Sequence, residues 1–376
     1  MMTIELKGRI DSSNAAEVEA KINEQIGDYS GEIILDASGL EYISSAGLRI
    51  ILRLKKANGS TKVINCNSEV YEIFDMTGFT EMMDIEKAYR KISIEGCEKI
   101  GEGSNGVVYR TDSDTIVKVY KMPDSLNEIH NERELARKAF IMGIPTAIPY
   151  DVVQVGDLYG SVFELLNATS FSKLINAGEA LDELARQSVE ILKTIHKTIL
   201  KNGELPRKKQ EAIEWAEYVK PYLPEEIGEK LIKLFNEIPE SNTMLHGDYH
   251  IKNIMRQGDE NLLIDMDTLS VGHPVFEFSQ MYLAYLGFSE TDHGDVMRFL
   301  GITRETSEQF WNSSLKYYFN GKDKEFIESA VIKARIIGYT RLLRRANKRS
   351  PEKKDVIDNC INQLCELVPE TDCLYF

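Results

Sequence analysis

Hydrophobic and polar positions follow two different periods along the first 95 residues. Residues 2–10, "MTIELKGRI", alternate between apolar and polar side chains, which is typical of a strand. Residues 12–26 begin with cap-type residues and then place apolar side chains at helical spacing. The same order recurs, and we expect strands at 31–38 and 61–66, helices at 44–59 and 68–78, and a last strand and helix within 79–94. Strands that alternate with helices favour a sheet with helices packed on it.

A different pattern begins near Gly96. β-Branched runs interrupted by glycines in residues 97–121 predict antiparallel hairpins, and residues 127–143 predict a charged amphipathic helix. Two more strands flank a Gly-Asp turn in residues 148–166. The pattern beyond about residue 170 is mostly helical, apart from short strands within 250–265. We therefore expect two domains, 1–95 and 96–376.

Composition narrows the class of protein. The chain has 376 residues, more than one typical domain, and 43% of them are hydrophobic, which is enough for a sizeable core. Its net charge of −15 argues against binding to nucleic acid or to an anionic membrane surface. The sequence has no leader-like segment, no apolar stretch long enough to span a bilayer, and five scattered cysteines without a C-x-x-C pair. We expect a cytoplasmic protein with neither nucleic acid nor membrane as partner.

A glycine-rich segment opens the second domain. "IGEGSNGVVY" fits the pattern G-x-G-x-x-G-x-V at Gly101, Gly103 and Gly106. Glycines allow backbone N–H groups to approach phosphate oxygens closely, although a plain hairpin turn also explains them. The strand-loop-strand setting argues against a dinucleotide-binding fold, which needs a helix directly after the glycines.

A lysine and two acidic residues follow this segment. Lys118 lies among apolar strand residues, where it is either a surface side chain or a cation for nucleotide phosphates held by a helix carboxylate. Glu132 and Glu134, in the helix predicted at 127–143, are the candidates for that carboxylate. An exposed helix face is the alternative explanation for both.

Residues 244–268, "MLHGDYHIKNIMRQGDENLLIDMDT", contain the chemistry of greatest interest. Asp248 is suited to orient an acceptor hydroxyl and take its proton, whereas Asn253 and Asp265 offer the oxygen ligands that Mg²⁺ prefers. We expect His246 to support the loop through a backbone hydrogen bond and His250 to be solvated. Asp267 either assists the metal or caps the following turn, and we favour the cap.

The segments "HGDYHIKN" and "LLIDMD" resemble the catalytic segment of the aminoglycoside phosphotransferase and choline kinase branch of the protein-kinase-like fold. The resemblance covers residues 96–376 and implies an α+β bilobal domain with an N-lobe at 96–165 and a C-lobe at 166–376. It also implies ATP and Mg²⁺ as cofactors and the hydroxyl of a small molecule as acceptor.

The resemblance rests on four ordered elements, whose residues take over the roles of the family's motifs. The resemblance implies the following roles: Gly101, Gly103 and Gly106 over the phosphates, Lys118 in contact with them, Glu134 paired with Lys118, Asp248 as catalytic base, Asn253 and Asp265 as Mg²⁺ ligands, and backbone groups of Glu164 and Leu166 at the adenine. Two features depart from the family pattern. The glycine segment is fuller than usual for this branch, and Glu277 replaces the Asp of "G-x-P-x-x-D", a position that we interpret as structural.

The N-terminal unit resembles a second family. "ILDASGLEYISSAGLRIILRLKK" and, further on, "IFDMTGF" are similar to STAS domains, the family of anti-sigma-factor antagonists, over about residues 2–94. The resemblance implies an α/β domain in which Ser45 is a regulatory phosphoacceptor, and it implies a protein partner such as an anti-sigma-factor-like kinase. A phosphate there would be stabilised by the helix N-terminus, but Ser44 and Ser45 are equally explained as ordinary capping residues.

Positive charge is concentrated in residues 333–349, "KARIIGYTRLLRRANKR". The spacing predicts an amphipathic helix, which we interpret as a solvated face over a core. Contact with a substrate phosphate or a partner is the alternative.

Three functions compete. The first is an ATP- and Mg²⁺-dependent phosphotransferase that acts on a small-molecule hydroxyl. The second is a protein Ser/Thr kinase of a partner-switching pathway that phosphorylates Ser45 or the serine of a partner's STAS domain. The third is a non-catalytic nucleotide-binding signalling module, against which the presence of Lys118, Asp248, Asn253 and Asp265 argues.

Overall fold

The computed structural model describes residues 1–103, 105–201, 203 and 205–376. The chain forms two compact units. The first comprises Met1–Gly96 with Val119–Pro123 and Val152–Gly160, and the second comprises Cys97–Lys118, Asp124–Asp151 and Ser161–Phe376.

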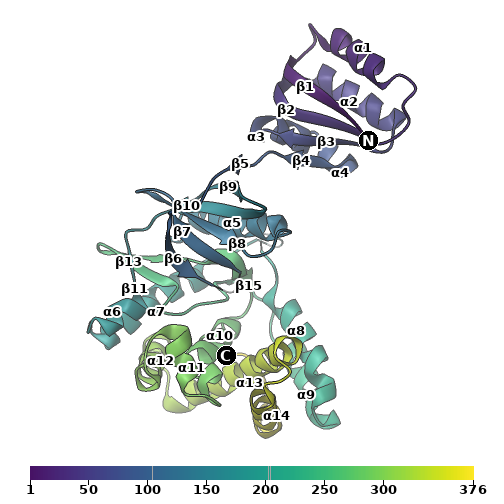
Figure 1. Ribbon diagram of the computed structural model, residues 1–376. Helices are drawn as coiled ribbons and strands as arrows, with labels where there is room; N and C mark the ends of the chain where they lie inside the picture. The colour runs from purple at the N-terminus through teal and green to yellow at the C-terminus, as the bar shows by residue number, and fades with distance from the viewer. Residues whose placement is uncertain (104, 202, 204) are drawn as a thin grey trace. The chain divides into compact units, whose positions relative to one another are not determined.

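The first unit contains an α/β domain with a four-stranded sheet of order β1-β2-β3-β4, in which all strands are parallel (Figure 1). Its elements are β1 (Met2–Ile10), α1 (Ala15–Ile26), β2 (Ile33–Ile43), α2 (Ser45–Ala57), β3 (Thr61–Cys66), α3 (Ser68–Met76), α4 (Phe79–Met82) and β4 (Ile85–Lys87). The alternation of strands and helices predicted from the sequence is confirmed through α3. Buried aliphatic side chains of the strands and of α2 form a continuous core.

Helix α2 begins at a close approach between backbone and core. The Ser44 hydroxyl accepts hydrogen bonds from the N–H groups of Ala46 and Gly47, which caps the helix. A Cβ atom at Gly47 would lie 2.6 Å from Ile43 Cγ1 and 2.8 Å from Ile10 Cγ2. Glycine therefore lets the helix start close against the ends of β1 and β2.

A six-stranded sheet follows, with strand order β5-β9-β10-β8-β7-β6. Its strands are β5 (Arg90–Lys91), β6 (Glu98–Glu102), β7 (Gly106–Arg110), β8 (Thr115–Tyr120), β9 (Pro149–Val155) and β10 (Leu158–Glu164), and helix α5 (Leu126–Ile141) lies between β8 and β9 in sequence. β6 and β7 form an antiparallel hairpin around the glycine-rich segment, as the sequence predicted. Ser104 of this segment lies outside the described residues.

The rest of the second unit is mostly helical, as expected. Its helices are α6 (Phe171–Asn176), α7 (Leu181–Lys197), α8 (Lys208–Val219), α9 (Glu225–Asn236), α10 (Val275–Tyr285), α11 (Gly294–Leu300), α12 (Arg304–Tyr318), α13 (Lys324–Arg349) and α14 (Lys354–Leu367), with short 3₁₀ turns at Lys220–Tyr222, Met266–Thr268 and Gly287–Ser289. Every residue of α10 is buried, and α10 packs against α13, so these two helices form the centre of the core.

Short strands interrupt the helices, and two of them lie within the predicted range 250–265, whereas the other three lie outside it. β11 (Thr169–Ser170), β13 (Ile254–Gln257) and β14 (Glu260–Leu263) form a three-stranded sheet, and β12 (Met244–Leu245) pairs with β15 (Ser270–Val271). The loop from β12 to β13 carries Asp248, and the segment after β14 carries Asp265. Sheet and loop together position the candidate site.

No helix in the described part of the chain has the length and apolar composition needed to cross a membrane. All five cysteines are free thiols.

Candidate active site

The loop after β12 is anchored by a buried carboxylate. The N–H groups of His246 and Gly247 donate to the two carboxylate oxygens of Glu277, at 2.6 and 2.9 Å. Glu277 is fully buried in α10 and also lies 3.8 Å from His196 Nε2. Although burial opposes ionisation, contacts with His196 and His246 lower the pKa of Glu277, so the carboxylate stays charged and binds the loop. The structural role expected for Glu277 is confirmed.

His246 fixes the other side of the loop. Its Nδ1 accepts a hydrogen bond from the Asp248 N–H at 3.3 Å, and its Nε2 lies 3.3 Å from the carbonyl oxygen of Ile264. The ring is fully buried and connects the Asp248 loop to the segment that leads into Asp265. The supporting role predicted for His246 is thus confirmed.

Asp248 lies at the partly exposed end of this loop, with 39% of its side chain accessible. Asn253 Nδ2 donates to the Asp248 carbonyl oxygen at 3.0 Å and lies 3.4 Å from Oδ2. Burial alone raises the pKa of a carboxylate, but contact with His250 and the charges of His246 and Arg341 lower the pKa of Asp248 below its ordinary value. The group is therefore an anion at neutral pH.

The expectation that His250 is solvated is wrong. Its side chain is only 5% exposed, and Nε2 lies 3.4 Å from Asp248 Oδ2. The ring also contacts Phe299 edge to face, with centroids 5.0 Å apart. His250 is therefore part of the wall beside Asp248.

Asn253 and Asp265 meet because of the hairpin between them. Asn253 directly precedes β13 and Asp265 follows shortly after β14, whose pairing brings Ile254 opposite Leu263. The Ile264 N–H donates to the Asn253 carbonyl oxygen at 3.0 Å, which closes the hairpin at this end. Asp265 has a left-handed backbone (φ 65°), a costly conformation for a residue other than glycine.

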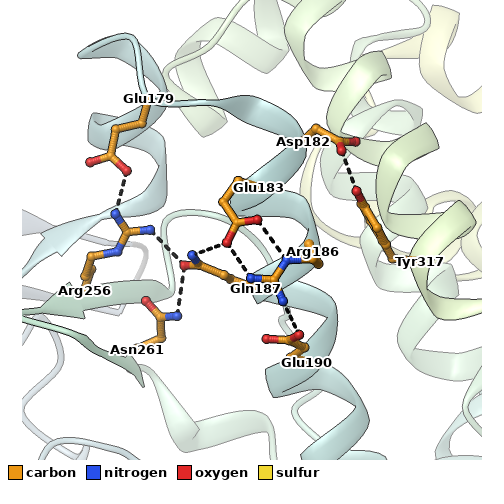
Figure 2. A network of polar contacts seen from close by, with 9 residues as sticks. All are labelled: Glu179, Asp182, Glu183, Arg186, Gln187, Glu190, Arg256, Asn261 and Tyr317. Carbon is orange, nitrogen blue, oxygen red and sulfur yellow. Dashed lines mark hydrogen bonds and ion pairs between the residues drawn. The ribbon is translucent and has the colours of Figure 1, made fainter.

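A polar network holds the hairpin against α7 (Figure 2). Arg256 in β13 and Asn261 in β14 both donate to Gln187 Oε1, at 2.8 and 3.2 Å. Arg256 also pairs with Glu179, and Gln187 donates to Glu183 at 2.7 Å. No sequence pattern indicated this network, because its members are far apart along the chain and have no shared motif.

Lys118 in β8 forms a buried ion pair with Glu132 in α5. The distances from Lys118 Nζ to the Glu132 carboxylate oxygens are 2.8 and 3.0 Å, and Asp265 Oδ1 lies at 3.3 Å. Burial opposes the charge of the lysine, but the carboxylates of Asp265 and Glu132 outweigh it and raise the pKa of Lys118. The amine is therefore held as a cation between the two carboxylates.

The prediction that Glu134 pairs with Lys118 is wrong. Buried residues of α5 recur at helical spacing, at Ile129, Glu132, Ala136 and Ala139, so Glu132 lies on the inner face. Glu134 is two positions further on, points outward with 65% of its side chain exposed, and pairs with Lys138 at 3.0 Å. Helical periodicity was the signal that distinguishes the two residues.

Asp267 does not act as the expected cap. It lies inside the 3₁₀ turn Met266–Thr268, whose capping position is Asp265, and no side chain caps this turn among the residues that the structure describes. Burial, together with the neighbouring charges of Asp265 and Glu132, raises the pKa of Asp267 to about 7. Asp267 therefore belongs to the acidic cluster around Lys118.

The segment after β10 contains the backbone N–H groups that were predicted to lie at the adenine, and their hydrogen-bond partners show which of them is available for a ligand. The Glu164 N–H donates to the Ile148 carbonyl oxygen at 3.1 Å, and the Leu165 N–H donates to that of Asp114 at 2.8 Å. The Leu166 N–H has no hydrogen-bond partner within the described ranges. Of the two residues predicted at the adenine, Leu166 thus has an available donor, whereas the N–H of Glu164 is already used.

A family model described as "Phosphotransferase enzyme family" matches residues 96–307, more than half of the chain. The chain belongs to the phosphotransferase enzyme family. Residues 1–92 of this phosphotransferase match the model of the STAS domain. That region is similar to BtrV of Bordetella bronchiseptica, named as an anti-sigma factor antagonist, with 32% identity over 84 residues that cover 21% of the phosphotransferase and 72% of BtrV.

Two solved structures share the fold of the phosphotransferase. Aminoglycoside phosphotransferase APH(2'')-Ib with bound ADP is 16% identical, with a TM-score of 0.50 over 81% of this chain and 99% of that one. A thermostable mutant of aminoglycoside phosphotransferase APH(4)-Ia, in a ternary complex with ADP and hygromycin B, is 12% identical, with a TM-score of 0.50 over 73% and 93%. At such identities the likeness shows the fold alone.

The Lys118 pair leads to a first prediction. Glu132→Gln is expected to weaken nucleotide binding about 10-fold or more, because a hydrogen bond to a charged group contributes about 1.5–3 kcal/mol. Glu134→Gln removes the same charge from the same helix on its outer face, and nucleotide affinity should stay within about twofold of wild type. Titration with a fluorescent ATP analogue measures both. Equal losses in the two variants would contradict the assignment of Glu132.

Proposed function

We propose that this enzyme transfers the terminal phosphate of ATP, with Mg²⁺, to a hydroxyl group of a small molecule. The observation that carries the proposal is the convergence of three segments on one place. Lys118 lies 3.3 Å from Asp265, and Asp265 and Asn253 lie at the same end of one hairpin. Asn253 in turn contacts Asp248. Phosphoryl transfer needs mainly such positioning and charge complementarity.

The glycine-rich hairpin fits a nucleotide. A Cβ atom built at Gly103 would meet no atom of the described residues within 4 Å, and neither Gly101 nor Gly103 has a positive φ. Neither packing nor backbone conformation therefore demands glycine at these positions. A ligand that approaches the backbone does demand it, and we assign the phosphates of ATP to this place, with Gly106 closing the turn and Lys118 as their cation. Leu166 and Glu164 would border the adenine.

The oxygen donors fit Mg²⁺ bound together with a nucleotide. Within the described residues, no group of three or more His, Cys, Asp or Glu side chains is arranged to hold a metal on its own. Mg²⁺ in nucleotide sites uses one or two carboxylates together with substrate phosphates and water. Asp265 supplies a carboxylate, and Asn253, whose amide nitrogen is used by Asp248, has its amide oxygen left as a ligand. When bound, Mg²⁺ would neutralise charge on the phosphates.

Asp248 acts on the acceptor in this proposal. Its carboxylate accepts a hydrogen bond from the acceptor hydroxyl and aims the oxygen at the terminal phosphorus. It takes the proton as the new P–O bond forms and the bond from that phosphorus to the bridging oxygen of ADP breaks, with ADP as the leaving group. The loop bonds from Glu277 and His246 keep the carboxylate in place while this occurs.

The proposal includes the organisation of the chain. We assign residues 1–95 to the STAS domain and residues 96–376 to the phosphotransferase domain, with its N-lobe at 96–165 and its C-lobe at 166–376. The STAS domain would bind a protein partner such as an anti-sigma-factor-like kinase, and we place the enzyme in the cytoplasm, where ATP is supplied.

ADP release in the presence of candidate alcohols tests the proposed function. The enzyme is incubated with ATP, with and without Mg²⁺, and with a panel of amino sugars, sugars, polyols and their phosphates. At least one alcohol should give ADP and a phosphorylated product in equal amounts, only with Mg²⁺. Nucleotide binding without turnover for every class would instead support a non-catalytic signalling module.

A second candidate function rests on Ser45. Its side chain is exposed at the first position of α2, whereas the neighbouring Ser44 uses its hydroxyl as the helix cap. A phosphate on Ser45 would lie at a helix N-terminus, which stabilises negative charge. This geometry favours Ser45 over Ser44 as a regulatory phosphoacceptor, modified in cis or by a partner kinase.

Under this second function, incubation of the chain with labelled ATP is expected to label Ser45. Ser45→Ala should then lose the label. Ser68→Ala should keep it, although Ser68 occupies the matching exposed position at the start of α3. Mass spectrometry of the labelled peptide identifies the site. Label that survives in Ser45→Ala would assign the acceptor to another residue.

A further inference from the structure

A cluster of arginines lies near Asp248 in a chain whose net charge is −15. Arg341, Arg344 and Arg345 all come from α13, within the basic segment singled out in the sequence. Arg341 and Arg345 are four residues apart, about one turn along α13, so they lie on the same face of the helix, and Arg341 is half-buried there. The basic helix is therefore not only a solvated face, as the preferred sequence interpretation held.

Arg341 is half-buried without a counter-ion. Its guanidinium carbon lies 5.6 Å from the centre of the Trp215 ring in α8, and Lys208 Nζ approaches the same ring at 5.9 Å. Arg341 makes no hydrogen bond and no ion pair within the described ranges. The nearby Glu211 pairs with Lys208 at 2.8 Å. Burial lowers the pKa of Arg341 by more than the charges of Asp248 and Glu211 raise it, and the neighbouring Arg345 and Arg344 lower it further.

Arg345 is connected to Asp248 by a row of ring contacts. Its guanidinium carbon lies 5.8 Å from the centre of the Phe288 ring, and Phe288 meets Phe299 edge to face at 5.7 Å. Phe299 contacts His250, which lies 3.4 Å from Asp248. The exposed Arg345 and the half-buried phenylalanines thus lie beside the partly exposed Asp248 carboxylate.

We propose that Arg341 and Arg345 bind an anionic group, a phosphate or a carboxylate, of the acceptor whose hydroxyl is presented to Asp248. This inference rests on the proposed function and narrows its substrate class to alcohols that carry an oxyanion. Guanidinium groups bind such oxyanions through paired hydrogen bonds, and the bound anion supplies the counter-charge that Arg341 lacks. The same arginines repel a polycationic acceptor such as an amino sugar.

Two observations beyond charge support an organic acceptor. The Trp215 indole N–H, next to Arg341, is buried and has no hydrogen-bond partner in the described part of the chain, and the same holds for His250 Nδ1. Phe288 and Phe299 add partly exposed apolar surface between the arginine and the base. A compact molecule with an anion at one end and a hydroxyl at the other matches this arrangement.

Binding of inorganic phosphate, measured by calorimetry without nucleotide, tests the inference independently of turnover. Arg341→Gln and Arg345→Gln are each expected to weaken phosphate binding about 10-fold or more, since charge-assisted hydrogen bonds are lost. Lys324→Gln removes a charge from the same helix at an exposed position, and it should leave binding unchanged. Phosphate binding that is lost in Lys118→Met but kept in both arginine variants would place the anion at the nucleotide site and overturn the inference.

Transfer assays with matched alcohols complete the test. Glycerol is compared with glycerol 3-phosphate and glycerate, and ribose with ribose 5-phosphate. The anionic member of a pair should be the better acceptor, and Arg341→Gln should raise its KM about 10-fold with little change in kcat. A change confined to kcat would make Arg341 a positioning residue for Asp248 and overturn the inference.

The outcomes separate the inference from the proposed function. If the arginine variants lose phosphate binding but no alcohol accepts a phosphate from ATP, the anion site is supported and the phosphotransferase proposal is refuted. If neutral or cationic alcohols accept the phosphate at rates that neither arginine substitution changes, the proposed function is supported and the anion site is refuted. Absence of phosphate binding, or equal binding in wild type and the arginine variants, also refutes the anion site.

Discussion

Asp248→Asn is expected to lower the rate of phosphoryl transfer by about 10²–10⁴-fold, the contribution typical of a general base. The amide keeps the size of the side chain but cannot accept the proton of the acceptor hydroxyl. The bonds that position the loop come from the backbone of His246, Gly247 and Asp248, so the loop should keep its conformation. Nucleotide affinity should therefore change little, and single-turnover kinetics together with nucleotide titration measure the two quantities.

Asp259→Asn is the matched control for this substitution. Asp259 lies exposed in the turn of the β13–β14 hairpin, so the same chemical change is made in the neighbouring segment without touching the site. We expect wild-type rates from this control. Undiminished transfer in Asp248→Asn would remove Asp248 from its assigned role, and a parallel loss of nucleotide affinity would point to a structural effect.

The elements of both domains could be predicted because their signals are local. Alternation and helical spacing identified β1, α1, α2, β3 and α3, and the glycine-rich segment does lie in a hairpin. The order of motifs indicated a phosphotransferase, and the family match bears this out. Local patterns of this kind depend only on neighbouring residues, so they can be recognised without knowing the tertiary structure.

The error over Glu134 has a physical origin in helix geometry. Spacing along the chain from Lys118 could not decide between two acidic residues, because a helix turns by about 100° per residue. Residues two apart therefore face nearly opposite sides. The buried positions Ile129, Ala136 and Ala139 define the inner face, and only Glu132 shares it. Applying the helical period to the whole segment would have identified Glu132.

Contacts between distant segments could not be predicted from sequence patterns. Gln187 holds Arg256 and Asn261 from about 70 residues away, and no motif connects them. The basic segment of α13 showed a charge pattern, but only the fold brings Arg341 to Trp215 and near Asp248. Tertiary packing decides which side of such a helix binds and which is solvated, so the sequence left both interpretations open.

Gly247→Ala should have the largest effect on stability among the substitutions at the site. Gly247 has φ +84°, a left-handed conformation that costs a residue with a side chain about 1–2 kcal/mol. An added Cβ atom would overlap the Thr268 carbonyl oxygen and lie 3.0 Å from Thr268 Cβ, and such overpacking costs about 1–3 kcal/mol more. Thr268 Oγ1 donates to the His246 carbonyl oxygen at 2.8 Å, so a shift there would displace both sides of the site.

Gly258→Ala separates the cost of the left-handed backbone from the cost of the steric overlap. Gly258 has φ +59° in the neighbouring hairpin, but a Cβ atom there would meet nothing within 4 Å in the described part of the chain, so only the backbone cost applies. Both tryptophans, Trp215 and Trp311, belong to the second unit, and their fluorescence reports its unfolding in urea. We expect the urea midpoint of Gly247→Ala to fall by roughly 1 M or more, with a smaller shift in Gly258→Ala. Equal shifts of the urea midpoint would mean that the loop moves to accommodate the added methyl group. This result would contradict the rigid attachment of Asp248 through Gly247 and Glu277.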